Sequence, residues 1–76
     1  MQNFDTELDT SGLSCPLPVM KAKKVLKDLG AGQVLHLIAT DPASTEDVPA
    51  LLEQIDCQLE ATRKDGAAYH FYIKKG

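Results

Sequence analysis

The spacing of apolar and polar positions predicts four strands in this chain of 76 residues. Residues 4–9 alternate between apolar or β-branched side chains and three acids, a period of two that is typical of a half-buried strand at an exposed edge. Residues 33–40 are almost continuously apolar, which predicts a central strand. Asp65-Gly66 separates two further runs, 57–64 and 67–75, and predicts a hairpin with a type I′ turn.

A period of three to four residues predicts two helices. The first runs from about Pro16 to Leu29 and ends at Gly30, and its buried stripe consists of Val19, Ala22, Val25, Leu26 and Leu29. The second carries the stripe Val48, Leu51, Leu52 and Ile55. Its start has two solutions. A cap at Ser44 puts Pro49 late enough to lose a helical hydrogen bond, whereas a cap at Asp47 puts that proline at the second helical position without loss.

The element order β-α-β-α-β-β has one economical arrangement. A strand, a helix and a strand form a right-handed parallel unit, and the last two strands add an antiparallel hairpin. Each helix has a single apolar stripe, so both helices are expected to cover one face of a four-stranded mixed sheet. The prediction is therefore a two-layer α/β (α+β) sandwich that forms one domain over residues 1–76.

Composition narrows the classes of function. A net charge of −3 argues against direct binding of nucleic acid, which needs a basic face. No apolar run approaches the ~20 residues that span a membrane, and the acidic N-terminus is unlike a signal peptide, so a cytoplasmic protein is expected. Cys15 and Cys57 lack C-x-x-C spacing and fit neither a disulfide framework nor a zinc site. We expect a monomer without a metal or another cofactor.

The segment Gly12 to Pro18 carries the candidate chemistry. Gly12 ends the first strand, and Cys15 is expected at the N-cap of the first helix, with Pro16 at the first helical position and Pro18 inside the first turn. The positive end of the helix dipole favours a thiolate there. Because the two prolines remove backbone donors, we expect only a moderate lowering of the Cys15 pKa. The competing interpretation is a small buried hydrophobic side chain.

Two groups of residues are candidates for the surroundings of Cys15. The solvent face of the first helix carries Leu17, Met20, Lys21 and Lys24, together with Lys23 and Lys27. This face is either simply solvated or a docking surface for an acidic partner. Asp41 ends the second strand and could approach the Cys15 loop, where its charge would raise the thiol pKa. Its role as the cap of an Asx turn is favoured.

Side chains of the strands are assigned to faces by parity. Leu59, Ala61, Tyr69, Phe71 and Ile73 are expected to face the helices. Cys57 shares this parity, so packing is favoured over redox chemistry. His70 and Tyr72 are expected to point to solvent or a partner. His36, in the middle of a strand, is interpreted as a histidine on the solvent face rather than as a catalytic base.

The motifs resemble the TusA/SirA-like family of small sulfur-carrier proteins. The resemblance rests on Cys-Pro-Leu-Pro at 15–18 after Leu-Asp-x-x-Gly-Leu at 8–13, on Thr-Asp-Pro-Ala at 40–43, on Asp-Val-Pro at 47–49 and on the closing strand. It runs from about Leu8 to the C-terminus and implies the same two-layer fold. It implies that Cys15 accepts a sulfane sulfur from a cysteine desulfurase or a rhodanese-type donor and holds it as a persulfide. The acceptor would be a protein in tRNA thiolation, cofactor sulfuration or sulfur oxidation.

Such a carrier acts with partner enzymes, which can supply the acid and the base. Many family members have an acidic residue between the prolines and a basic residue before the cysteine, where this chain has Leu17 and Ser14. Two other functions are considered. In a regulatory or protein-binding module, the Cys-Pro-Leu-Pro loop would act without sulfur transfer. A thiol-disulfide protein would pair Cys15 with Cys57, although the missing C-x-x-C motif weighs against this function.

Overall fold

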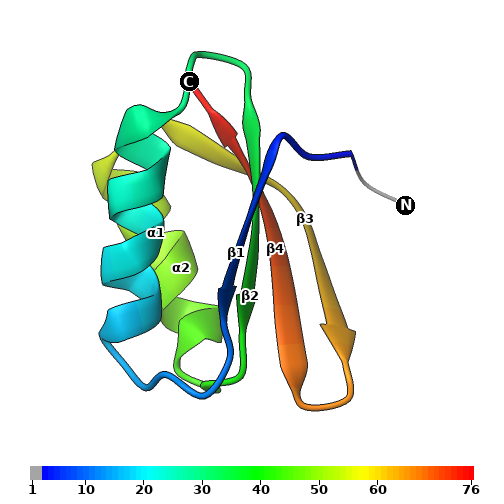
Figure 1. The fold of residues 1–76 in the computed structure, drawn as a ribbon. Coiled ribbons are helices and arrows are strands. Elements are labelled where there is room, and N and C mark those ends of the chain that lie inside the picture. Colours follow the sequence, from blue (N-terminus) through cyan, green and yellow to red (C-terminus); the bar gives the residue numbers. More distant parts are fainter. Residues whose placement is uncertain (1–2) are drawn as a thin grey trace.

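A computed structural model describes residues 3–76 and contains the six elements in the predicted order (Figure 1). The bounds are β1 Thr6–Thr10, α1 Leu17–Asp28, β2 Val34–Ala39, α2 Ser44–Gln54, β3 Cys57–Asp65 and β4 Ala68–Lys75. No helix within residues 3–76 is long and apolar enough to cross a membrane.

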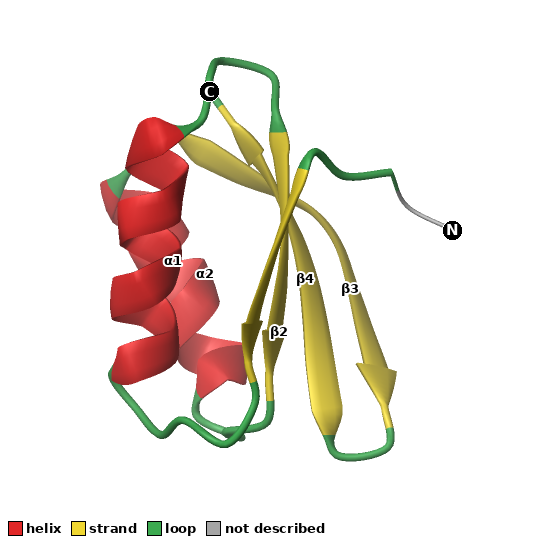
Figure 2. Cartoon of the chain, in the orientation of Figure 1, coloured by secondary structure: helices red, strands yellow, loops and turns green. Residues whose placement is uncertain are grey.

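The four strands form one mixed sheet in the order β1-β2-β4-β3. The strands β1 and β2 are parallel, while β4 is antiparallel to both β2 and β3. Both helices lie on the same face of this sheet (Figure 2). The predicted fold class is confirmed: the chain is a two-layer sandwich, with β1 at one edge and β2 inside the sheet.

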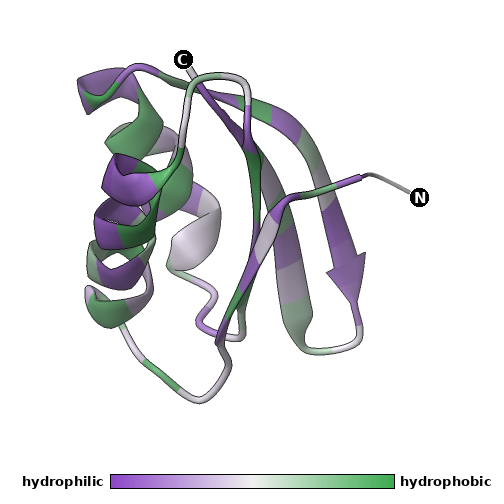
Figure 3. Ribbon diagram, turned by 45° about the horizontal axis from the view of Figure 1, so that its top comes forward, coloured by the Kyte–Doolittle hydropathy of each residue, from purple (hydrophilic) through white to green (hydrophobic). Residues whose placement is uncertain are grey.

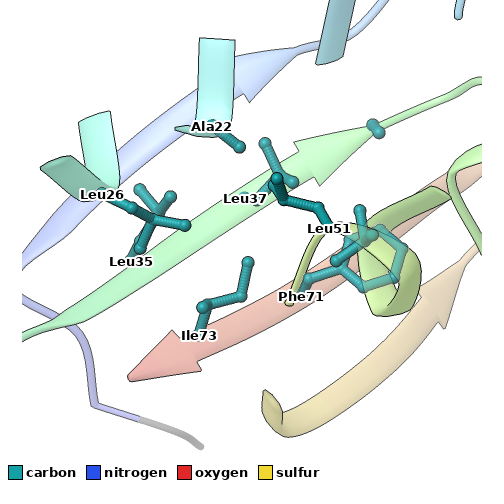
Figure 4. Packing of buried hydrophobic residues seen from close by; sticks show 9 residues of the cluster. Ala22, Leu26, Leu35, Leu37, Leu51, Phe71 and Ile73 are labelled. Carbon is teal, nitrogen blue, oxygen red and sulfur yellow. The ribbon is translucent and has the colours of Figure 1, made fainter. Parts of the chain in front are cut away.

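The core lies between the helices and the sheet. Its fully or almost fully buried apolar residues are Ala22, Leu26, Leu35, Leu37, Ala39, Val48, Leu51, Phe71 and Ile73 (Figure 4). The predicted helix stripes are confirmed, because their remaining members, Val19, Val25, Leu29, Leu52 and Ile55, pack against this cluster. In Figure 3 hydrophilic and hydrophobic residues alternate along both helices, as expected for helices that are buried along one side.

The start of α1 differs from the prediction by one residue. The helix begins at Leu17, and Pro16 is the N-cap with φ −100° and ψ 15°. Cys15 therefore lies one residue before the cap. At the other end, α1 stops at Asp28 and Leu29 adopts an extended conformation. Gly30 needs no positive φ there, and Gly32 supplies the left-handed conformation of the turn, with φ +87°.

The helix α2 begins at Ser44, so a cap at Asp47 is wrong. Ala43 is the N-cap residue, and the Ser44 hydroxyl donates a hydrogen bond to the backbone oxygen of Asp41 (2.6 Å). Pro49 consequently lies inside the helix, where it cannot donate a helical hydrogen bond. The Asp47 side chain is not used as a cap and can serve another purpose.

The hairpin differs from the prediction at its turn and in its register. Asp65 pairs with Ala68, so the turn consists of Gly66 and Ala67. Of these two turn residues, only Gly66 has a positive φ (+62°), which fits a type II′ turn and not the predicted type I′. An irregularity between Leu59 and Ala61 then changes the face that β3 presents. Ala61 opposes Tyr72 on the side away from the helices, so its predicted inward position is wrong.

The face of the sheet opposite the helices buries aromatic side chains. His36 and Tyr72 lie on this face, as predicted, but they are only 6% and 4% exposed, so their predicted exposure to solvent is wrong. Their rings stack with centroids 4.5 Å apart, and Phe4, which precedes β1, covers His36 at 4.9 Å. His36 Nδ1 bonds Glu7 Oε1 (3.0 Å), and His36 Nε2 shares a hydrogen bond with His70 Nδ1 (2.8 Å). Side chains on a nominally open face thus bury one another.

Candidate functional site

The site forms where two loops meet at the carboxyl ends of β1 and β2. The loop from β1 to α1 and the loop from β2 to α2 lie beside each other at the lower end of the molecule in Figure 1. Gly12 joins them, because its N–H donates to the Thr40 hydroxyl (2.9 Å). Gly12 has φ +84°, a conformation that side chains with a Cβ rarely adopt. This glycine therefore shapes the loop that presents Cys15.

Cys15 is exposed, and Asp41 holds its backbone. The Cys15 N–H donates to Asp41 Oδ2 (2.6 Å), while Asp41 Oδ1 accepts the N–H of Ala43 (3.2 Å). Asp41 thus approaches the Cys15 loop as anticipated and also makes the Asx-type turn that was favoured. The Asp41 carboxylate therefore holds the Cys15 backbone next to the start of α2.

Asp47 contacts the sulfur itself, a contact that the sequence pattern did not predict. The Cys15 thiol donates to Asp47 Oδ2 at an Sγ–O distance of 3.0 Å. The two residues are 32 positions apart, and α2 brings the carboxylate to the sulfur. The Asp-Val-Pro motif at 47–49 is a visible signal, because it forms part of the resemblance to the family, although the pattern of the sequence offers Asp47 only as one of two possible helix caps.

These carboxylates reverse the expected electrostatics of the thiol. The pKa of Cys15 is raised, first by the hydrogen bond to Asp47, then by desolvation and by the negative charges of Asp47 and Asp41. The predicted lowering by the α1 dipole is wrong. The Leu17 N–H is engaged by the Ser14 oxygen (2.9 Å) and Pro18 has no N–H, so the first turn offers little to the sulfur.

A groove of about 240 Å³ opens beside Cys15, between the two helices. Its lining is mostly apolar, with Asp47 as its one charged residue: Cys15, Pro16, Val19, Asp47, Ala50, Leu51 and Gln54. Pro18, in the first turn of α1, is buried. The site therefore combines an exposed sulfur, a carboxylate and room for at least one additional atom next to the sulfur.

The predicted docking residues lie on the outer surface of α1. Leu17 and Met20 are 42% and 59% exposed, and Lys21 and Lys24 are exposed as well. The apolar side chains follow Cys15 directly along the chain, and the lysines continue along the helix. The structure places these four residues at the surface, while their role in docking stays a prediction.

The second cysteine, Cys57 in β3, lies near the other end of α1. Cys57 is partly buried against the core, as predicted, and lines a small pocket with Leu26 and Lys27. Both thiols are free. Because the 12 residues of α1 span roughly 18 Å, Cys57 lies well beyond the ~7 Å between Cα atoms that a disulfide tolerates. Within residues 3–76, no three side chains with metal-ligating groups cluster.

Fold and site together describe a small carrier domain with one exposed thiol. The family model described as sulfurtransferase TusA matches residues 6–75. The sulfur carrier protein TusA of Allochromatium vinosum is 51% identical over 75 residues, which cover 99% of both chains. The crystal structure of a SirA-like protein from Desulfitobacterium hafniense superposes with a TM-score of 0.82 at 32% identity, covering 95% of this chain and 99% of that chain. The chain belongs to the TusA family, as its motifs indicated, and its role is that of a sulfur carrier.

Proposed function

We propose that Cys15 is the residue that carries the sulfur, as a persulfide. In the loading step, the Cys15 sulfur attacks the sulfane sulfur of a persulfide on the donor. A new S–S bond forms at Cys15, the S–S bond of the donor breaks, and the proton of the Cys15 thiol ends on the donor sulfur. In the delivery step, a thiol of the acceptor attacks the outer sulfur and Cys15 leaves as the thiol. Each step is an exchange between sulfur atoms, so neither needs an external oxidant or reductant.

The observation that carries this proposal is the position of Cys15. Its side chain is exposed in a loop at the carboxyl edge of the sheet, and the groove beside it can accommodate an outer sulfur atom. The other thiol, Cys57, lies at the far end of α1, so no neighbouring cysteine within the described chain can resolve a persulfide into a disulfide. A persulfide on Cys15 would therefore persist until an acceptor reaches it.

A sulfur carrier works with a donor and an acceptor. We propose a cysteine desulfurase or a rhodanese-type enzyme as the donor and a protein thiol as the acceptor, in tRNA thiolation, cofactor sulfuration or sulfur oxidation. The exposed surface of Leu17, Met20, Lys21 and Lys24 is the proposed docking surface, because an apolar patch with lysines along the same helix complements an acidic partner.

Intact-mass analysis tests the carrier residue directly. The protein is incubated with a cysteine desulfurase and cysteine, or with a rhodanese and thiosulfate, and compared with Cys15→Ser and Cys57→Ser. We expect a gain of one sulfur, about 32 mass units, that reduction removes and that only Cys15→Ser abolishes. An adduct that stays in Cys15→Ser, or no adduct from any donor, would contradict the proposal. The latter result would favour a protein-binding module.

Docking is tested by changing Leu17 without touching the thiol. Leu17→Gln removes the apolar contact and keeps the charge, while Leu17→Glu adds the charge that many relatives carry. Slower sulfur transfer in both variants, from donors that load the unchanged protein, is the expected result. An unchanged rate with every donor would show that this position does not contact the partner.

A further inference from the structure

The hydrogen bond between Cys15 and Asp47 has a defined direction. Asp47 stands in the first turn of α2, where the positive end of the helix dipole favours a negatively charged side chain. An ionised carboxylate can only accept hydrogen bonds, so the thiol must be the donor. Removal of the thiol proton would place a thiolate 3.0 Å from a carboxylate oxygen, and two negative charges at this distance repel each other.

We propose that Asp47 is a catalytic residue of sulfur transfer, which holds Cys15 as a protonated, hydrogen-bonded thiol between transfers and makes loading depend on the donor complex. This inference rests on Cys15 being the sulfur carrier. Asp47 acts on the reacting atom itself, since its carboxylate contacts Sγ. Its effect on the free protein is to restrain the nucleophile, and the donor must break this contact before the sulfur can attack.

Asp41 strengthens the restraint from the second loop. Its carboxylate is bound by the N–H groups of Cys15 and Ala43, so it stays next to the sulfur as a second negative charge. Among the described residues, Asp47 and Asp41 are the charged groups that shift the Cys15 pKa, together with desolvation, and all of them raise it. The neighbours of Cys15 on the α1 side, Pro16 and Leu17, carry no charge.

The Asp47 carboxylate also influences the form of the protein in which Cys15 carries a persulfide. An outer sulfur attached to Sγ would extend into the groove that Asp47 also lines. A negative charge at this place disfavours an anionic persulfide and favours its protonated form. The protonated persulfide is the form whose outer sulfur an acceptor thiolate attacks, because attack on an anion is opposed by charge. Asp47 thus slows unassisted loading and keeps the outer sulfur of the loaded protein protonated.

A general base would have the opposite effect. If Asp47 withdrew the proton to generate the nucleophile, its neutralisation would make Cys15 less reactive. If Asp47 restrains the thiol, neutralisation makes Cys15 more reactive toward a reagent that needs no docking. The sign of the change in reactivity therefore separates the two roles.

The experiment measures alkylation of Cys15 by iodoacetamide between pH 6 and 10, in a Cys57→Ser background so that one thiol reacts. Iodoacetamide is uncharged, so the variants do not change its local concentration. Asp47→Asn is compared with Asp28→Asn, which removes the same charge at the distant end of α1. We expect Asp47→Asn to react about 3- to 10-fold faster at pH 7, with the midpoint of its pH profile at lower pH. Asp28→Asn should stay within about twofold of the parent, because distant exposed charges are screened.

An unchanged or slower alkylation of Asp47→Asn, in a protein that still unfolds cooperatively, would overturn the inference. If this variant does not fold, Asp47→Ser serves in its place, since serine is well tolerated in the first turn of a helix. Sulfur loading, followed by intact mass, separates this test from the proposed function. If Asp47→Asn is alkylated faster but the parent protein never gains a persulfide, the proposal that Cys15 carries the sulfur is refuted, while the restraint of the thiol by Asp47 stands. If the parent protein is loaded normally but Asp47→Asn is alkylated at the parent rate, only the role of Asp47 is refuted.

Discussion

Replacement of Leu37 by alanine should remove a large share of the stability of this domain. Leu37 is 0% exposed, lies in the inner strand β2, and stands beside Leu8 on β1 and Phe71 on β4. Figure 4 shows its side chain among core residues from both helices and the sheet. Leucine-to-alanine changes at such sites cost about 3–5 kcal/mol, because apolar contact is lost and a cavity remains. We expect a loss of about 3–4 kcal/mol, since a domain with helices on one face only can partly collapse around the gap.

The size of the domain makes this loss severe. At the usual ~0.05–0.15 kcal/mol per residue, a chain of 76 residues has a free energy of unfolding of roughly 4–11 kcal/mol. A loss of 3–4 kcal/mol corresponds to a fall in Tm of roughly 12–32 °C, at ~4–8 °C per kcal/mol for domains of this size.

Urea unfolding, followed by circular dichroism, measures the change in the free energy of unfolding. Leu59→Ala is the matched control, because the Leu59 side chain is 37% exposed, and it should cost less than about 1 kcal/mol. A loss below about 1 kcal/mol for Leu37→Ala, or equal losses for the two variants, would refute the assignment of the core to the layer between helices and sheet.

Three further predictions concern the loops and the second face of the sheet. Gly12→Ala should cost about 1 kcal/mol in urea unfolding, because φ is +84° although no atom lies within 4 Å of the added Cβ; a neutral or stabilising effect would contradict this. Asp41→Ala should abolish the hydrogen-exchange protection of the Cys15 amide, whereas Asp41→Asn should retain part of it through its amide oxygen; equal protection in all three proteins would show that the 2.6 Å contact does not hold the loop. The pKa of His70 is lowered by burial, with Arg63 and His36 adding to the effect, so the unfolded chain binds this proton more readily. Stability should therefore fall as the pH drops below about 6.5, and His70→Gln should flatten this slope in unfolding experiments between pH 5 and 8; an identical slope in the variant would exclude His70 as its source.

The sequence by itself determined the elements and their order. Periods of two and of three to four residues depend on which side of an element meets the core, and this information is local. One apolar stripe per helix was enough to place both helices on one face, and the motif around Cys15 was enough to identify the candidate sulfur and the family. The errors at the starts of the two helices amounted to one to a few residues, and neither helix has a side-chain cap that would fix its first residue.

Only the tertiary structure decided which residues surround Cys15 and how they shift the pKa of its thiol. Asp41 lies 26 positions from Cys15 and was expected near its loop from the end of the second strand, but Asp47 lies 32 positions away, and its approach depends on how α2 packs beside that loop, which no local period encodes. Their charges, and not the dipole of α1, determine the direction of the Cys15 pKa shift. The burial of His36 likewise depends on the rings of Phe4 and Tyr72, which pack against it from other parts of the chain. Electrostatic and packing effects act through space over a few ångströms, so residues distant in the chain set the chemistry of a sulfur whose position the local sequence already indicated.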